Sequence, residues 1–156
     1  MSKHFILAFA LTVTACAGIE KARADDGDEW RINAGGVSWH SDRAAHYQET
    51  NLGVGLEYRR GDWGAMAGAY RNSIDRTSRY ALGEWLPIQA GPVRIGAVAG
   101  VVTGYHWRDG GPVPVLAPMA TTSIGRLGIN VLAFPIKEKT SGTGIVVGLQ
   151  ATWRIN

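Results

Sequence analysis

The chain ends in a strand-like stretch that decides its fold, Val147-Gly148-Leu149-Gln150-Ala151-Thr152-Trp153-Arg154-Ile155. Apolar residues occupy the odd positions, and glycine or polar residues occupy the even ones. This alternation has the period of a β-strand, in which successive side chains point to opposite faces. The stretch therefore predicts a strand with one apolar face and one polar face.

The same alternation recurs along the chain. It is clear from Leu52 to Arg59 and weaker from Leu127 to Ala133. The full pattern predicts eight strands, at residues 30–41, 51–60, 63–72, 79–89, 93–104, 113–124, 127–135 and 144–155. Their lengths suit tilted membrane strands of about 9–11 residues.

Short and long connections alternate between the predicted strands. Tight turns are expected at Gly61-Asp62, Ala90-Gly91-Pro92 and Gly125-Arg126. Longer polar stretches are expected at residues 42–50, 73–78, 105–112 and 136–143. This alternation is typical of bacterial outer-membrane barrels, which have short periplasmic turns and longer outer loops. We therefore expect an all-β, eight-stranded antiparallel outer-membrane β-barrel over residues 25–156, with the long connections outside the cell.

A soluble barrel of the lipocalin kind is the alternative, with an apolar interior and a polar exterior. Polar residues share the glycine-bearing face of the strands, including Glu57, Arg59, Gln150 and Arg154. An interior of small and polar residues suits a narrow membrane barrel. Aromatic residues also stand near predicted strand ends, as in a membrane girdle: Trp30, Trp39, Tyr58, Trp63, Trp107 and Trp153.

The first 24 residues read as a secretory signal peptide. The apolar run at residues 5–13 follows Lys3 and is too short to span a bilayer as a helix. Ala22-Arg23-Ala24 is a signal-peptidase site, which makes residues 1–24 the signal peptide. Val13-Thr14-Ala15-Cys16 resembles a lipobox and is the competing site. We prefer the first site, because a domain embedded in the membrane needs no lipid anchor.

Composition excludes several classes of function. Cleavage after Ala24 removes three basic residues and one acidic residue, so the net charge falls from +3 to +1 and gives no reason to expect nucleic acid. Cys16 is the only cysteine, which excludes a disulfide framework and a thiol metal site. The histidines lack metal-ligand spacing, and the glycine-rich run at 96–100 is strand packing. We expect no metal and no cofactor.

Two predicted strands place a candidate nucleophile and base at one rim. The first strand ends at His40, and the third ends at Asn72 and Ser73. Both strands run in the same direction, so these residues reach the same, outer end of the barrel. A serine becomes a useful nucleophile beside a histidine base, and an amide or carboxylate can orient the imidazole. Taken alone, the same residues also fit ordinary solvated loops.

Three blocks carry a resemblance to a known family. They are Val37-Ser38-Trp39-His40, the run from Trp63 to Ser73, and the proline-rich run from Pro112 to Ala120. In order and content they resemble the PagP family, the outer-membrane enzymes that move palmitate from a phospholipid to lipid A. The likeness covers nearly all of residues 30–156, and the third block is its most specific part.

The resemblance implies catalytic roles. His40 matches the family's catalytic histidine, and Ser73 matches its serine. The family has Asp directly before that serine, whereas this chain has Asn72. Asn can hold an orientation but carries no charge, so the carboxylate role either lapses or passes to Asp42 or Asp75. Ser73 either becomes acylated or stabilises the oxyanion.

The resemblance also implies substrate-binding residues. Pro118 and Pro135 match the prolines that flank a gap in the barrel wall through which lipid enters, although both prolines also fit plain strand ends. A second family gap is not matched, since Ala34 and Asn51 replace its prolines. The expected acyl-pocket residues are Met66, Gly68 and Gly83, and the expected headgroup residues at the outer rim are Arg108 and Asp109.

The expected function is therefore transfer of a palmitoyl or similar chain from a phospholipid to lipid A. The enzyme would be a monomer in a Gram-negative outer membrane, with its active site facing the cell exterior. Two alternatives stay open, a lipid A deacylase or phospholipase and a non-enzymatic structural barrel. The acyl-chain length and the acceptor position on lipid A stay undetermined.

Overall fold

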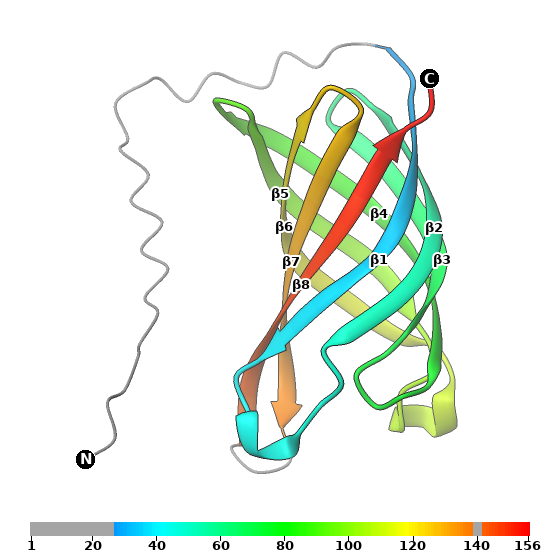
Figure 1. Ribbon diagram of the computed structural model, residues 1–156, viewed down its shortest axis with the longest axis vertical. Helices are drawn as coiled ribbons and strands as arrows, with labels where there is room; N and C mark the ends of the chain where they lie inside the picture. The colour runs from blue at the N-terminus through cyan, green and yellow to red at the C-terminus, as the bar shows by residue number, and fades with distance from the viewer. Residues whose placement is uncertain (1–26, 139–141) are drawn as a thin grey trace, which may run out of the picture.

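The computed structural model describes residues 27–138 and 142–156, which form a closed antiparallel barrel (Figure 1). The strands are β1 (Glu29–His40), β2 (Thr50–Arg60), β3 (Trp63–Arg71), β4 (Thr77–Ala90), β5 (Val93–Val102), β6 (Val113–Ile124), β7 (Leu127–Glu138) and β8 (Gly142–Arg154). Each strand pairs with its neighbours in sequence, and β1 pairs with β8 to close the barrel. The predicted eight-stranded fold is confirmed. The predicted signal peptide and Cys16 lie outside the described residues.

The two ends of the barrel differ. At the turn end, the strands are joined by tight turns in which Gly61, Gly91 and Gly125 have φ of 61°, 59° and 60°, a left-handed conformation that glycine adopts without strain. At the loop end lie the longer connections, which include the 3₁₀ turns η1 (Arg43–Ala45) and η2 (Trp107–Gly110) (Figure 1). The predicted alternation of connections is confirmed for these segments.

The prediction of a long connection at residues 136–143 is wrong in its extent. Ile136 pairs with Gly144 and Lys137 with Thr143, so β7 and β8 continue their ladder through most of that stretch. Backbone pairing between adjacent antiparallel strands outweighs the polar character of these residues. Residues 139–141 lie outside the described part of the chain.

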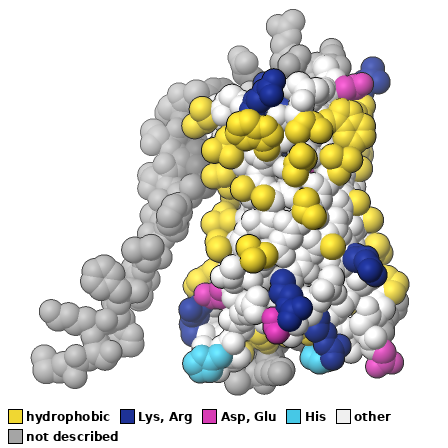
Figure 2. Space-filling model, turned by 45° about the vertical axis from the view of Figure 1, so that its right-hand side comes forward, with side chains coloured by type: hydrophobic (Ala, Val, Ile, Leu, Met, Phe, Trp, Pro, Cys, Tyr) yellow, Lys and Arg dark blue, Asp and Glu magenta, His cyan; other side chains and the backbone are white. Residues whose placement is uncertain are grey.

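The outer wall is apolar. Figure 2 shows hydrophobic side chains spread over the wall, with charged side chains towards its two ends. Leu52 and Leu116 are each 71% exposed. Exposed aromatic residues gather near the turn end, where Trp30 lies 4.9 Å from Tyr58 and Trp63 lies 5.9 Å from Trp85 between ring centroids.

An apolar wall with an aromatic girdle would cost free energy in water but is stable in a bilayer. In the described residues, no helix is long and apolar enough to cross a membrane. The apolar outer wall and the closed antiparallel topology make the chain a membrane β-barrel.

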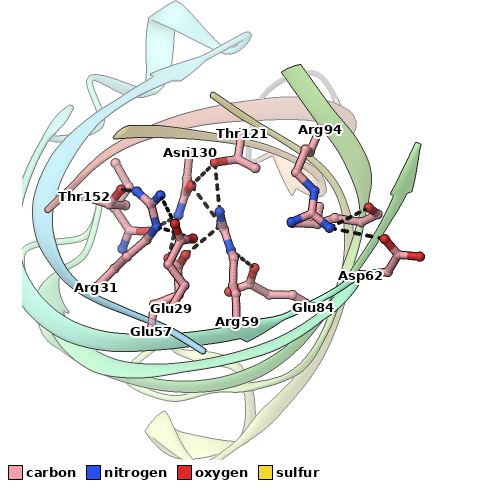
Figure 3. Close-up of polar contacts among 12 residues, drawn as sticks. Glu29, Arg31, Glu57, Arg59, Asp62, Glu84, Arg94, Thr121, Asn130 and Thr152 are labelled. Atoms are coloured by element: carbon pink, nitrogen blue, oxygen red, sulfur yellow. Dashed lines mark hydrogen bonds and ion pairs between the residues drawn. The ribbon is translucent and has the colours of Figure 1, made fainter. Parts of the chain in front are cut away.

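The interior of the turn half is filled by a polar network (Figure 3). Arg59 lies at its centre: Nε donates to Glu84 Oε2 at 2.8 Å, and Nη2 lies 2.7 Å from Glu57 Oε1. Arg59 also donates to Thr121 and Asn130, both at 3.2 Å. These buried groups are joined by ion pairs and hydrogen bonds, so this half of the barrel is plugged, as eight-stranded barrels usually are.

The buried apolar residues form one cluster. It consists of Met66, Leu82, Leu86, Val98, Ala117, Met119 and Leu132. Tyr80, Val115 and Phe134 pack against it. Met66, Leu82 and Leu132 of this cluster also line a cavity in the loop half of the barrel.

Candidate active site

The loop half of the barrel encloses a cavity of about 570 Å³. Its walls are largely apolar and include Met66, Leu82, Val115, Leu132 and Phe134. The volume lies in the range of about 300–1,000 Å³ that small-molecule sites occupy. A cavity lined in this way accepts an apolar chain rather than a charged ligand.

His40 lies at the end of β1 and lines this cavity. Its side chain is only 3% exposed, and its backbone pairs with Val146 of β8. The ring of Tyr47 stacks on the imidazole with 4.6 Å between centroids. His40 Nδ1 lies 3.9 Å from Glu49 Oε1. The imidazole is therefore held between a stacking ring and a carboxylate at the edge of an apolar cavity.

Ser73 lies in the connection between β3 and β4 and lines the same cavity. Its carbonyl oxygen accepts a hydrogen bond of 3.1 Å from the backbone N–H of Gln48. Gln48 directly follows Tyr47, which stacks on His40. The structure thus brings His40 and Ser73 to one cavity and links their two connections through residues 47 and 48.

Asn72 has a different role from the one expected. Its Nδ2 donates to Ser78 Oγ at 2.9 Å and to the Gly104 carbonyl at 3.1 Å. Its Oδ1 accepts from the N–H groups of Ile74 and Arg76. Fully buried, Asn72 organises the β3–β4 connection, and these contacts do not orient His40.

The two alternative carboxylates each accept a hydrogen bond within their own connection or its flanking strand. Asp75 is exposed and lies 2.7 Å from Arg71 Nε, and this hydrogen bond holds the pKa of Asp75 below its usual range. Asp42 accepts from the N–H of Ala44 at the start of η1. A carboxylate that does approach the His40 imidazole is that of Glu49, which the sequence reasoning missed. Its position just before β2, facing the end of β1 across one connection, was the available signal.

A pair of tyrosines adds polar groups near the loop end. Tyr70 of β3 and Tyr105 of the β5–β6 connection both line the cavity, and their hydroxyl oxygens lie 2.9 Å apart. Burial raises the pKa of Tyr105, and the neighbouring Tyr70 adds to this rise. The Tyr105 phenol is therefore neutral and able to donate a hydrogen bond. The sequence reasoning did not single out either residue.

The barrel wall opens between β6 and β7. Within the described residues, their pairing runs from Ile124–Leu127 to Met119–Leu132 and stops there. Beyond that pair each strand keeps its other neighbour, so Pro118 still pairs with Ala97 of β5. Pro135 likewise pairs with Ile145 of β8.

The prolines explain why the two strands part. Since proline has no N–H, it fits a ladder only where its nitrogen faces away from the paired strand. Pro118 and Pro135 both lie beyond the last paired position of the β6–β7 seam, and neither has an N–H to donate there. Pro135 and Leu116 line the cavity, whereas Pro118 lies exposed on the outer wall. On the other side, β1 and β2 stay paired up to Val37–Thr50, with an irregularity between Ala34 and Gly36.

The remaining residues expected at the site lie in different places in the structure. Met66 lines the cavity. Gly68 makes room beneath Tyr80, since a Cβ there would lie 2.8 Å from the Tyr80 hydroxyl. Gly83 is exposed between Leu82 and Glu84, which are both buried, so the expectation that it lines the pocket is wrong. Asp109 is exposed in η2, and the side chain of Arg108 lies outside the described part.

Comparison with known proteins supports the architecture. The chain is similar to the de novo designed transmembrane β-barrel TMB2.3, with a TM-score of 0.56, 15% identity, and coverage of 85% of this chain and 98% of the designed one. No protein-family model matches the chain. No curated protein matches it either. In the described residues, no three His, Cys, Asp or Glu side chains are grouped so as to hold a metal ion.

Proposed function

We propose that this barrel is an outer-membrane acyltransferase that moves a palmitoyl or similar chain from a phospholipid to lipid A. One observation carries the proposal: an apolar cavity of about 570 Å³ has His40 and Ser73 at its edge and reaches the β6–β7 opening. The resemblance of the three sequence blocks to the PagP family supports the same assignment.

The proposed reaction transfers one ester bond. The lipid enters between β6 and β7, and its acyl chain lies among Met66, Leu132 and Phe134. His40 takes the proton of the attacking hydroxyl, either that of Ser73 or that of lipid A. The hydroxyl oxygen bonds to the acyl carbon, the phospholipid ester bond breaks, and the proton passes to the departing alcohol. If Ser73 is acylated, lipid A attacks in a second step; otherwise Ser73 stabilises the oxyanion.

The orientation of the barrel in the membrane follows from the same proposal. Lipid A resides in the outer leaflet, so the loop end faces the cell exterior. The exposed side chains of Arg71 and Arg76 lie at this end, where arginines can bind lipid phosphates. The barrel acts as a monomer, because its own cavity holds both candidate catalytic groups.

Mass spectrometry of lipid A tests the function. The chain is expressed in a Gram-negative strain that lacks its own acyltransferase, and wild type should add one acyl chain to lipid A. His40→Ala and Ser73→Ala, with the barrel folded, should abolish this product. Ser123→Ala, which changes an exposed serine at the turn end, should not.

The same spectra separate the competing functions. Loss of an acyl chain would assign deacylation to the site, with water as the acceptor. A lipid A profile that neither wild type nor the two variants change would overturn the proposed enzymatic function. It would leave a structural barrel, of which the plugged turn half is typical.

A further inference from the structure

Three consecutive residues contact the candidate pair from one side. Tyr47 stacks on the His40 imidazole at an interplanar angle of 29°. Gln48 N–H donates to the Ser73 carbonyl at 3.1 Å. Glu49 Oε1 accepts from the backbone N–H of His40 at 3.3 Å and lies 3.9 Å from His40 Nδ1. The segment 47–49 thus fixes the plane of the imidazole, ties down the serine connection and supplies a carboxylate.

The carboxylate of Glu49 is kept charged. Its Oε1 is also paired with Arg43 Nη1. Partial burial acts to raise the pKa of Glu49, but hydrogen bonds from Arg43 and from the His40 amide outweigh it and hold the pKa below its usual range. At neutral pH, a negative charge therefore stands next to the imidazole of His40.

We infer that Glu49 is the positioning residue of His40, an inference that rests on the proposed acyl transfer. Asn72 brings no charge and is engaged in its own connection. A carboxylate on the Nδ1 side holds that N–H in place, so that Nε2 is the nitrogen that accepts a proton.

In this arrangement the proton moves to and from Nε2 of His40. When His40 takes the hydroxyl proton on Nε2, the imidazole becomes a cation, and the charge of Glu49 stabilises it. The proton then moves from Nε2 to the departing alcohol, and Glu49 stays ionised throughout. The 3.9 Å separation is longer than a hydrogen bond, as is common in enzymes without bound substrate, where such contacts tighten in the reacting complex.

Steady-state kinetics test this role. Purified wild type, Glu49→Gln and Glu49→Asp are compared in mixed micelles of phospholipid donor and lipid A acceptor, and kcat and KM are measured by mass spectrometry. Glu49→Gln should lower kcat by at least about 10-fold, because the imidazole loses the carboxylate that orients it, with KM unchanged. Glu49→Asp keeps the charge and should recover part of kcat.

Asp28→Asn is the matched control. It also removes a carboxylate paired with an arginine, but it lies at the turn end and its partner is Arg60. Its kcat and KM should equal those of wild type. Migration on unheated SDS gels shows that each variant is folded. If Glu49→Gln does not fold, Glu49→Asp and Glu49→Asn replace it, because both shorten the side chain and only the first keeps the charge.

The outcomes separate this inference from the proposed function. Wild-type kcat in folded Glu49→Gln, or equal kcat in Glu49→Asp and Glu49→Asn, overturns the inference and leaves acyl transfer standing. A higher KM with unchanged kcat also overturns it, because Glu49 would then bind substrate. A wild type that transfers no acyl chain overturns the proposed function and this role with it.

Discussion

Met119 and Leu132 form the last paired position between β6 and β7 on the way to the loop end. Beyond that pair, Pro118 is the next residue of β6, and Pro135 lies three residues further along β7 than Leu132. Each proline stays in register with its outer neighbour, Ala97 and Ile145 respectively. The opening in the wall is therefore a local loss of backbone donors in an otherwise closed barrel.

Restoring these donors should close the wall. Pro118→Ala with Pro135→Ala should extend the β6–β7 ladder, with about 0.5–1.5 kcal/mol gained for each new hydrogen bond. Hydrogen–deuterium exchange should show slower exchange in residues 113–118 and 133–138, and acyl transfer should slow because lipid entry is obstructed. Pro92→Ala, in the β4–β5 turn, should change neither quantity. Unchanged exchange in the double variant would show that the prolines do not hold the seam apart.

The substitution Asn72→Asp should destabilise the barrel rather than improve catalysis. An ionised aspartate at this position cannot donate to the Gly104 carbonyl, so a carboxylate oxygen and a carbonyl oxygen, which are both acceptors, would face each other in a buried site. Leaving such groups unsatisfied costs about 1–3 kcal/mol. Urea unfolding in detergent measures the loss. Asn51→Asp, at a partly exposed side chain that donates to the Arg71 carbonyl, should cost less. An increase in transfer rate with Asn72→Asp would contradict the assignment of Asn72 to the connection.

Filling the cavity should block the acyl chain without unfolding the barrel. Gly148 lines the cavity, and a Cβ built there meets no atom within 4 Å. Gly148→Leu should therefore fold normally while binding of a fluorescent fatty-acyl probe and acyl transfer both fall. Gly83→Leu adds the same side chain on the lipid-facing wall and should affect neither. Full probe binding by Gly148→Leu would mean that the acyl chain lies elsewhere.

The polar network should dominate the stability of the turn half. Arg59→Leu leaves Glu57 and Glu84 buried without their shared cation, so we expect a loss of about 3–5 kcal/mol in the free energy of unfolding. Arg60→Leu removes the adjacent exposed arginine, which lies 3.7 Å from Asp28, and should cost far less because such surface pairs contribute about 0–1 kcal/mol. Equal losses in the two variants would argue against a plug centred on Arg59.

The sequence by itself determined the barrel, because strand alternation and turn chemistry are local. The run from Val147 to Ile155 shows both faces of its strand, and glycine at positions 61, 91 and 125 marks turns that need a left-handed backbone. The placement of His40 and Ser73 at one rim also follows from strand direction alone. The exception is the β7–β8 hairpin, where pairing continued through residues with polar character.

The tertiary structure decided what contacts those two residues. Asn72 stands beside Ser73 in sequence, yet its amide donates to Ser78 of β4 and to Gly104 of the β5–β6 connection, which lie next to it in the folded barrel. Glu49 is nine positions from His40 and reaches it only when the β1–β2 connection closes. The cavity likewise depends on which interior side chains meet across the barrel. Such contacts arise from the packing of distant strands, which no local pattern in the sequence encodes.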